Sequence, residues 1–146
     1  MTDVAQLFTD LVRAETRLYN AVDDRLRQVH GLSLGQYELM TIIGSRDDCR
    51  IYDIVREIAI TVGAASKAVD RLERAGWCRR LAHPTDGRSS LLRLTPAGSR
   101  MLAKAGPTFT YELRARLDGV PTRALAQTAA TLASLRASLE EHQRDD

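Results

Sequence analysis

Basic side chains gather in one stretch of the sequence, between residues 67 and 93. The stretch carries seven lysines and arginines against three acidic residues, a net charge of +4, whereas the remainder carries 14 basic and 16 acidic residues, a net charge of −2. Guanidinium and ammonium groups bind phosphate oxygens, so a basic segment on a nearly neutral body is typical of a surface that binds nucleic acid. A solvated basic face is the simpler alternative, and the elements that carry these charges decide between the two.

The first of these elements is a predicted helix over residues 62–75. Thr61 can cap its start, and Gly76 can end it in a left-handed conformation. Helical periodicity predicts an inner face of Ala65, Ala68 or Val69, and Leu72, and an outer face of Ser66, Lys67, Asp70, Arg71 and Arg74. The helix therefore presents polar and basic groups to the outside.

The start of this helix carries the residues best suited to DNA. Gly63 and Ala64 are small enough to let the backbone approach a duplex closely. Ser66 can donate to a phosphate or a base edge, and Lys67 and Arg71 can reach phosphates or guanine acceptors. Together with the cap residue Thr61, these five residues form the predicted contact set on the helix.

A β-hairpin with a basic tip is predicted directly after this helix. Residues 77–82 and 90–94 are short strand-like runs, and residues 83–88 between them are rich in turn formers. Arg88 at the tip can enter an adjacent minor groove, where the negative potential favours arginine. Trp77 is predicted to pack, and three further arginines on the strands are predicted to face phosphate or solvent: Arg79, Arg80 and Arg93.

Helices precede these two elements. Apolar residues recur at helical spacing over residues 7–29 for about six turns, and Gly31 ends the pattern. This helix is longer than one small core requires, which favours a partner subunit. Ser33 is a predicted cap for a second helix that ends near Gly44, and residues 52–58 form a short amphipathic helix.

Two more helices are predicted after the hairpin. Thr95 and Pro96 start the first, which reaches Leu117 and is expected to bend at residues 106–107, where a proline removes a backbone hydrogen bond. The last helix opens at residue 121 or 122 and carries four leucines on one stripe: Leu125, Leu132, Leu135 and Leu139.

The order of these elements predicts a mainly α fold with a small β-hairpin, a winged helix-turn-helix flanked by long terminal helices. In a helix-turn-helix unit the second helix enters the major groove with its N-terminal residues nearest the bases. Here residues 33–98 form the predicted DNA-binding lobe of a single domain over residues 1–146.

Three segments resemble one known family. Residues 86–98, DGRSSLLRLTPAG, look like the wing signature of the multiple antibiotic resistance regulator (MarR) family. Residues 34–39, LGQYEL, are similar to the second helix of that family, and residues 61–77 are similar to its recognition helix and the step into the wing. The wing string is the most specific of the three.

The resemblance implies a homodimer that binds double-stranded DNA. The terminal regions 1–30 and 107–142 would join two chains, and each chain would contact half of a palindromic operator, most often as a repressor. On matching positions, Asp86 would hold Arg88 by an ion pair and Arg88 would reach the minor groove. Gly87 departs from the family, in which a second basic residue is frequent, and residues 120–126 lack the usual acidic start of the last helix.

The resemblance also implies a small anionic or aromatic effector that releases DNA. In the family its pocket lies between the DNA-binding lobe and the helical dimer region. The residues predicted to border such a pocket are Arg17, Tyr19, Tyr37 and Met40, with Met101 and Tyr111 as further candidates. Each has plain core or surface packing as its alternative.

The two cysteines indicate no metal or redox chemistry. Neither forms a CxxC motif or has a histidine at ligand spacing, which argues against a zinc site and a disulfide framework. Cys78, on a strand, is predicted to be buried, whereas Cys49, in a polar loop, can be exposed. Redox-sensing members of the family carry their cysteine in the first helix, where this chain has none.

The sequence offers little support for functions other than DNA binding. The sequence has no nucleophile elbow, phosphate loop or HExxH motif, so an enzyme is not expected and no cofactor or metal is predicted. No signal peptide and no membrane span is recognised, and a cytoplasmic location is expected. The alternative that remains is a winged-helix module for protein contacts, or for non-specific or architectural DNA binding.

Overall fold

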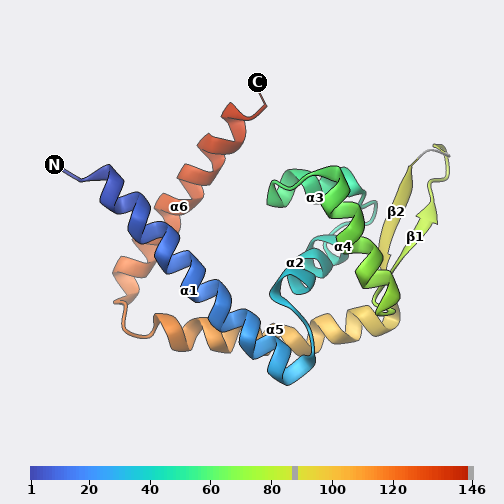
Figure 1. Cartoon of the computed structure of the whole chain (residues 1–146), viewed down its shortest axis with the longest axis horizontal. Coiled ribbons are helices and arrows are strands. Elements are labelled where there is room, and N and C mark those ends of the chain that lie inside the picture. Colours follow the sequence, from blue (N-terminus) through green and yellow to red (C-terminus); the bar gives the residue numbers. More distant parts are fainter. Residues whose placement is uncertain (87–88, 145–146) are drawn as a thin grey trace. The chain divides into compact units, whose positions relative to one another are not determined.

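The computed structural model describes residues 1–86 and 89–144. The chain divides into two compact units, residues 1–113 and residues 114–146 (Figure 1). Its elements in order are α1 (Val4–His30), α2 (Leu34–Gly44), α3 (Ile51–Ile58), α4 (Val62–Arg74), β1 (Cys78–Ala82), β2 (Ser90–Leu94), α5 (Pro96–Leu117) and α6 (Thr122–His142). The predicted fold class, mainly helical with one antiparallel hairpin, is confirmed.

Local capping chemistry sets the ends of the first two helices. Gly31 has a φ of 64° and its N–H donates to the Arg27 carbonyl at 3.0 Å, a left-handed cap that glycine adopts without steric cost. Ser33 begins α2 with a capping box, in which its Oγ accepts from Gln36 N and the Gln36 side chain accepts from Ser33 N. The Asp23 carboxylate accepts from Leu34 N at 2.8 Å and so ties the two helices together.

The core of the first unit joins all the elements from α1 to α5, with Cys78 of β1 and Ala105 of α5 among its buried residues. Val22 and Leu26 of α1 are buried with the inner residues of α2, with Ile54 of α3, with Ala65, Val69 and Leu72 of α4, and with Leu92 of β2. The predicted inner face of α4 is therefore confirmed, with Val69 rather than Ala68 as its fully buried member. Because α4 buries one stripe against this core, its opposite side is turned to solvent.

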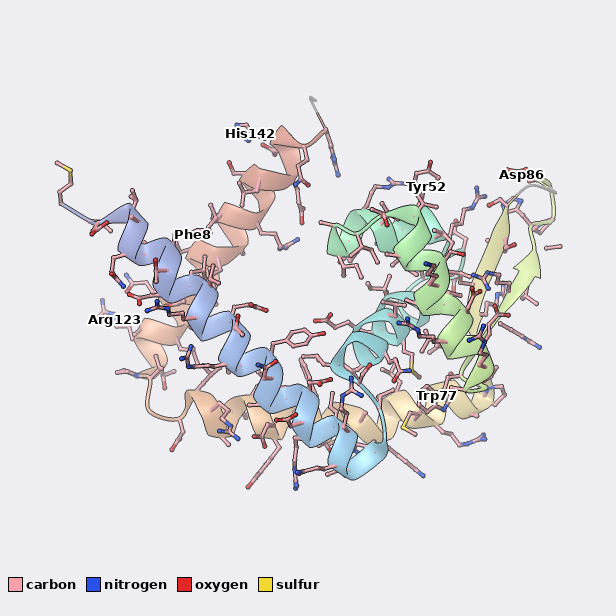
Figure 2. The ribbon with its side chains drawn as sticks, viewed as in Figure 1. Phe8, Tyr52, Trp77, Asp86, Arg123 and His142 are labelled. Atoms are coloured by element: carbon pink, nitrogen blue, oxygen red, sulfur yellow. The ribbon has the colours of Figure 1, made fainter. Side chains whose placement is uncertain are left out.

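The hairpin is anchored at its base to α4 and α5. The strands pair antiparallel with Cys78 opposite Leu94 and Arg80 opposite Leu92. Thr95 N donates to the Trp77 carbonyl at 3.0 Å, and Thr95 Oγ1 accepts from Gly98 N at 3.0 Å, which caps α5 as predicted. Trp77 packs against the core where the hairpin meets α5, as the sequence predicted (Figure 2).

The loop before α3 differs from its predicted environment. Cys49 has no exposed surface, so the expectation that it can be exposed is wrong. Its carbonyl accepts from Leu92 N of β2 at 2.8 Å, and this backbone bond draws the loop into the core. Cys78 is buried at 3% exposure, as predicted.

Both thiols are therefore expected to be inert in the folded protein. Burial, with nearby acidic side chains, raises the pKa of Cys49 and of Cys78 to about 11. Since the thiolate is the reactive species, a chromogenic disulfide reagent at pH 8 should label neither thiol quickly, and should label both in denaturant. Rapid labelling of one thiol in the native protein would contradict this prediction, and single Cys→Ser variants would assign it.

The second unit contains the end of α5 and α6. α5 runs without interruption through Pro107, and residues 118–120 separate it from α6. None of the residues of α6 is buried, and Leu132, Leu135 and Leu139 are all exposed. No helix among residues 1–86 and 89–144 is long and apolar enough to cross a membrane.

Candidate nucleic-acid interface

The N-terminal end of α4 is open to solvent. Thr61 caps it as predicted, with its Oγ1 accepting from Ala64 N at 3.1 Å. Gly63 and Ala64 are exposed, and Lys67 and Arg71 project from the same side of the helix, one turn apart. A Cβ added at Gly63 would meet nothing within 4 Å, so none of residues 1–86 and 89–144 crowds this position.

Ser66 has a partner that the sequence did not indicate. It is half-buried, and its Oγ accepts a hydrogen bond of 3.3 Å from Arg80 of β1. A hydroxyl oxygen that accepts still carries one proton to donate. The predicted donation from Ser66 to DNA is therefore compatible with this contact.

Arg80 points its guanidinium at α4 rather than at solvent. Its Nη1 donates to Asp70 Oδ1 at 2.7 Å and to Glu73 Oε1, and its Nη2 donates to the Ser66 carbonyl oxygen at 3.2 Å. Burial acts to lower the pKa of this group, but the bonds and charges of the two carboxylates outweigh burial and raise it. The prediction that Arg80 faces phosphate or solvent is wrong, because two carboxylates on α4 bind it.

The other two strand arginines face solvent. Arg79 and Arg93 are exposed and lie opposite each other in the ladder. Neighbouring residues of a strand point to opposite sides, so Arg79 and Arg80 must diverge. The hairpin thus turns one arginine of β1 toward α4 and leaves the other free of it.

His83 organises the turn that follows β1. Its Nδ1 accepts from Thr85 N at 3.1 Å and from Asp86 N at 3.0 Å, and its Nε2 lies against Arg50 Nη2 from the start of α3. Asp86 is exposed at the outer end of the hairpin (Figure 2). Arg88 lies outside the described residues, and its predicted ion pair with Asp86 and its minor-groove contact remain predictions.

The arrangement places two DNA-compatible surfaces next to each other. α4 and the hairpin lie side by side, linked by Arg80 and by the bond from Trp77 N to the Leu72 carbonyl at 3.0 Å (Figure 1). Lys67 and Arg71 on one element and Arg79 on the other are exposed cations of this region. A helix that enters the major groove with a hairpin beside it requires these two elements to be neighbours.

Part of the chain matches a known protein family. The sequence profile described as the MarR family matches residues 32–90. The HTH-type transcriptional regulator BilQ of Clostridium symbiosum is 29% identical over 82 residues, which span 56% of this chain and 57% of the length of BilQ. A structure described as a probable transcriptional regulator from Pseudomonas aeruginosa matches with a TM-score of 0.81 at 25% identity, over 89% of this chain and 96% of that one.

The chain resembles the MarR family over residues 32–90, which carry α2, α3, α4 and β1. A mutant of MarR from E. coli, crystallised with operator DNA, matches with a TM-score of 0.83 over 90% of this chain and 94% of that one. Its identity of 17% shows a shared fold alone.

The residues predicted to border a MarR-type effector pocket lie in different environments. Arg17 is exposed on α1 and donates to the Arg13 carbonyl of the preceding turn. Met40 has no exposed surface, and Tyr37 stacks on Phe109 of α5 with ring centroids 4.7 Å apart. These two side chains therefore contribute to packing in this structure.

Tyr19 and its neighbours form an acidic environment. Burial, followed by the charges of Glu38 and Asp23, raises the pKa of the Tyr19 hydroxyl. Burial and Glu15 in turn raise the pKa of Glu38. A neutral or cationic group is favoured over an anion beside Tyr19. Of the further candidates, Met101 is half-buried and Tyr111 is 71% exposed.

A hollow of about 330 Å³ lies elsewhere in the same unit, residues 1–113. Its wall includes Arg27, the start of α2 at Ser33 and Gln36, and Ala68 and Arg71 of α4. The sequence predicted Arg71 as a DNA contact and did not connect it with a cavity. Among the described parts of the chain, no group of His, Cys, Asp and Glu side chains could hold a metal ion.

The organising roles of Arg80 and His83 in the hairpin were not predicted from the sequence. Strand alternation would have placed Arg79 and Arg80 on opposite sides. The carboxylates Asp70 and Glu73, three residues apart on the predicted α4, were the available signal for an arginine partner. The role of His83 depends on the local turn geometry, and residue type alone did not indicate it.

Proposed function

We propose that this protein is a sequence-specific DNA-binding transcriptional regulator. The observation that carries the proposal is the open start of α4, with Lys67 and Arg71 exposed beside a hairpin that also presents Arg79. In a helix-turn-helix unit this end of the second helix contacts base edges, while cations on either side bind phosphates. Similar transcriptional regulators, among them a MarR mutant crystallised with operator DNA, support the proposal.

We further propose that the protein acts as a homodimer on a palindromic operator, as a repressor. α1 leaves Leu7, Phe8 and Leu11 exposed near its start, and α6 by itself leaves three leucines exposed. Exposed apolar side chains along long helices are typical of a protein–protein interface. Two copies related by a two-fold axis would place two recognition helices about 34–36 Å apart on one face of the duplex.

A binding titration against the DNA that flanks the gene for this chain tests the proposal. The protein is titrated at two salt concentrations against that DNA and against a scrambled duplex of equal length. We expect two chains per duplex and a preference for a palindromic site by about 10³ or more. Equal, salt-sensitive binding to both duplexes would favour the architectural alternative, and little change in Arg88→Ala would favour a module for protein contacts.

The proposal extends to a small anionic or aromatic effector that weakens the DNA complex. By linkage, such a ligand can lower DNA affinity only as far as it prefers a dimer with another spacing of recognition helices. The hollow is lined by two cations, Arg27 and Arg71, and by the apolar side chain of Leu39. Aromatic carboxylates titrated into the preformed complex test this part, and an unchanged DNA affinity at saturation with every bound ligand would contradict it.

A further inference from the structure

We propose that Arg80 is a positioning residue for DNA recognition. It fixes the hairpin against α4 and so sets the relative positions of the two elements that contact DNA. The inference rests on the proposed function and adds to it a residue that itself contacts no DNA. It stands on the four hydrogen bonds that Arg80 makes to three residues of α4.

Arg80 attaches β1 to α4 at a point beyond the base of the hairpin. The base is held by backbone bonds at Trp77 and Thr95. Residues two apart on a strand share a face, and Cys78, two residues before Arg80, is buried against α4 with its Sγ 4.0 Å from the Val69 carbonyl. Arg80 therefore continues the α4-facing side of β1 toward the tip.

Arg80 spans nearly two turns of α4. Its partners Ser66, Asp70 and Glu73 are separated by four and three residues, so they lie in a row on one side of the helix. The planar guanidinium can bind several acceptors in one fixed orientation, which a lysine ammonium cannot do. Rotation or sliding of β1 along α4 would break these bonds together.

The charge balance of this cluster separates positioning from phosphate binding. Two carboxylates surround one guanidinium, and Arg80 is only 26% exposed, so its charge is already compensated within the protein. A phosphate contact would contribute to the salt dependence of binding, whereas a compensated charge would not. Arg79, exposed on the opposite side of the same strand, is the matched cation without this role.

Ser66 links the cluster to the predicted contact surface. Arg80 binds both its carbonyl oxygen and its Oγ, and Lys67 is the next residue along the helix. The bond to Oγ leaves the hydroxyl proton free to point away from β1. Loss of Arg80 thus removes a restraint on a side chain predicted to donate to DNA, besides loosening the hairpin.

The test compares Arg80→Gln/Glu73→Gln with Arg79→Gln. The double variant removes one positive and one negative charge and so keeps the net charge of the protein. We expect its operator preference over scrambled DNA to fall by about tenfold, the equivalent of one good base contact, with the affinity for scrambled DNA and the salt slope unchanged. Arg79→Gln should weaken binding to both duplexes alike and leave their ratio intact.

A conservative variant and a melting curve complete the design. Arg80→Lys keeps the charge but reaches fewer acceptors, so its operator preference should lie between that of the wild type and that of the double variant. If the double variant does not fold, a reduced preference in folded Arg80→Lys supports the inference and an unreduced one overturns it. A lower melting temperature with an unchanged preference in folded variants would mean a purely structural role and also overturn it. A wild type without operator preference would instead refute the proposed function.

Discussion

Gly98→Ala is expected to destabilise the first unit by at least about 3 kcal/mol, the upper range of overpacking in a close-packed interior. A Cβ at this position would lie 2.0 Å from the Trp77 carbonyl oxygen and 2.8 Å from the carbonyl carbon. Both are backbone atoms, and the Trp77 oxygen is already held by Thr95 N. Since neither can yield as a side chain can, α5 would have to move away from the hairpin.

Urea unfolding followed by far-ultraviolet circular dichroism measures this effect. Gly63→Ala is the matched control, because Gly63 is also helical and a Cβ there would meet nothing within 4 Å. The control should be neutral or more stable by up to about 1 kcal/mol, since alanine favours a helix over glycine. Equal stability of Gly98→Ala and the wild type would show that Trp77 and α5 are not packed as the structure has them.

Lys67→Ala/Arg71→Ala is expected to weaken operator binding by about 10³-fold. A dimer loses four side-chain contacts in this variant, and each contact is taken to contribute about 1 kcal/mol. Both side chains are exposed on the open side of α4. The salt slope should fall by roughly one unit for each phosphate that a subunit no longer binds. Fluorescence anisotropy at several salt concentrations gives the affinity and the slope together.

Arg100→Ala/Lys104→Ala provides the control for charge. These exposed residues of α5 carry the same two charges, so the double variant lowers the net charge equally. It should change the affinity and the slope far less than the α4 variant. Equal reductions of affinity in both double variants would mean that net charge, not the surface of α4, determines binding.

Much of the fold follows from local chemistry. Gly31, Ser33, Thr61 and Thr95 cap or end helices as predicted, because a left-handed glycine or a hydroxyl acceptor acts on backbone groups within a few residues. The residues of the two hairpin strands were predictable because turn-forming residues separate two strand-like runs. Ala59, by contrast, ends α3 with a φ of 53°, a conformation that alanine does not favour and that no local signal indicated.

The parts of the candidate site that escaped prediction depend on long-range contacts. Cys49 is buried because its loop pairs with β2, 43 residues later, through Leu92. Arg80 binds α4 because the hairpin folds back onto the helix. The sequence pattern did not distinguish Arg80 from the other arginines of the strands. The exposed residues Gly63, Ala64, Lys67 and Arg71 were predictable, since helical periodicity alone decides which side of α4 meets solvent.

The hydrogen bond from Leu92 N to the Cys49 carbonyl affects how the wing, the hairpin of β1 and β2, opens. A two-stranded ribbon by itself is only marginally stable in water, and its amide protons exchange rapidly with solvent. Here β2 is hydrogen-bonded to the loop before α3, and both Leu91 and Leu92 are buried. The strands of the wing therefore belong to the same cooperative unit as α2 and α4, so their slowest amide protons should exchange only when that whole unit opens.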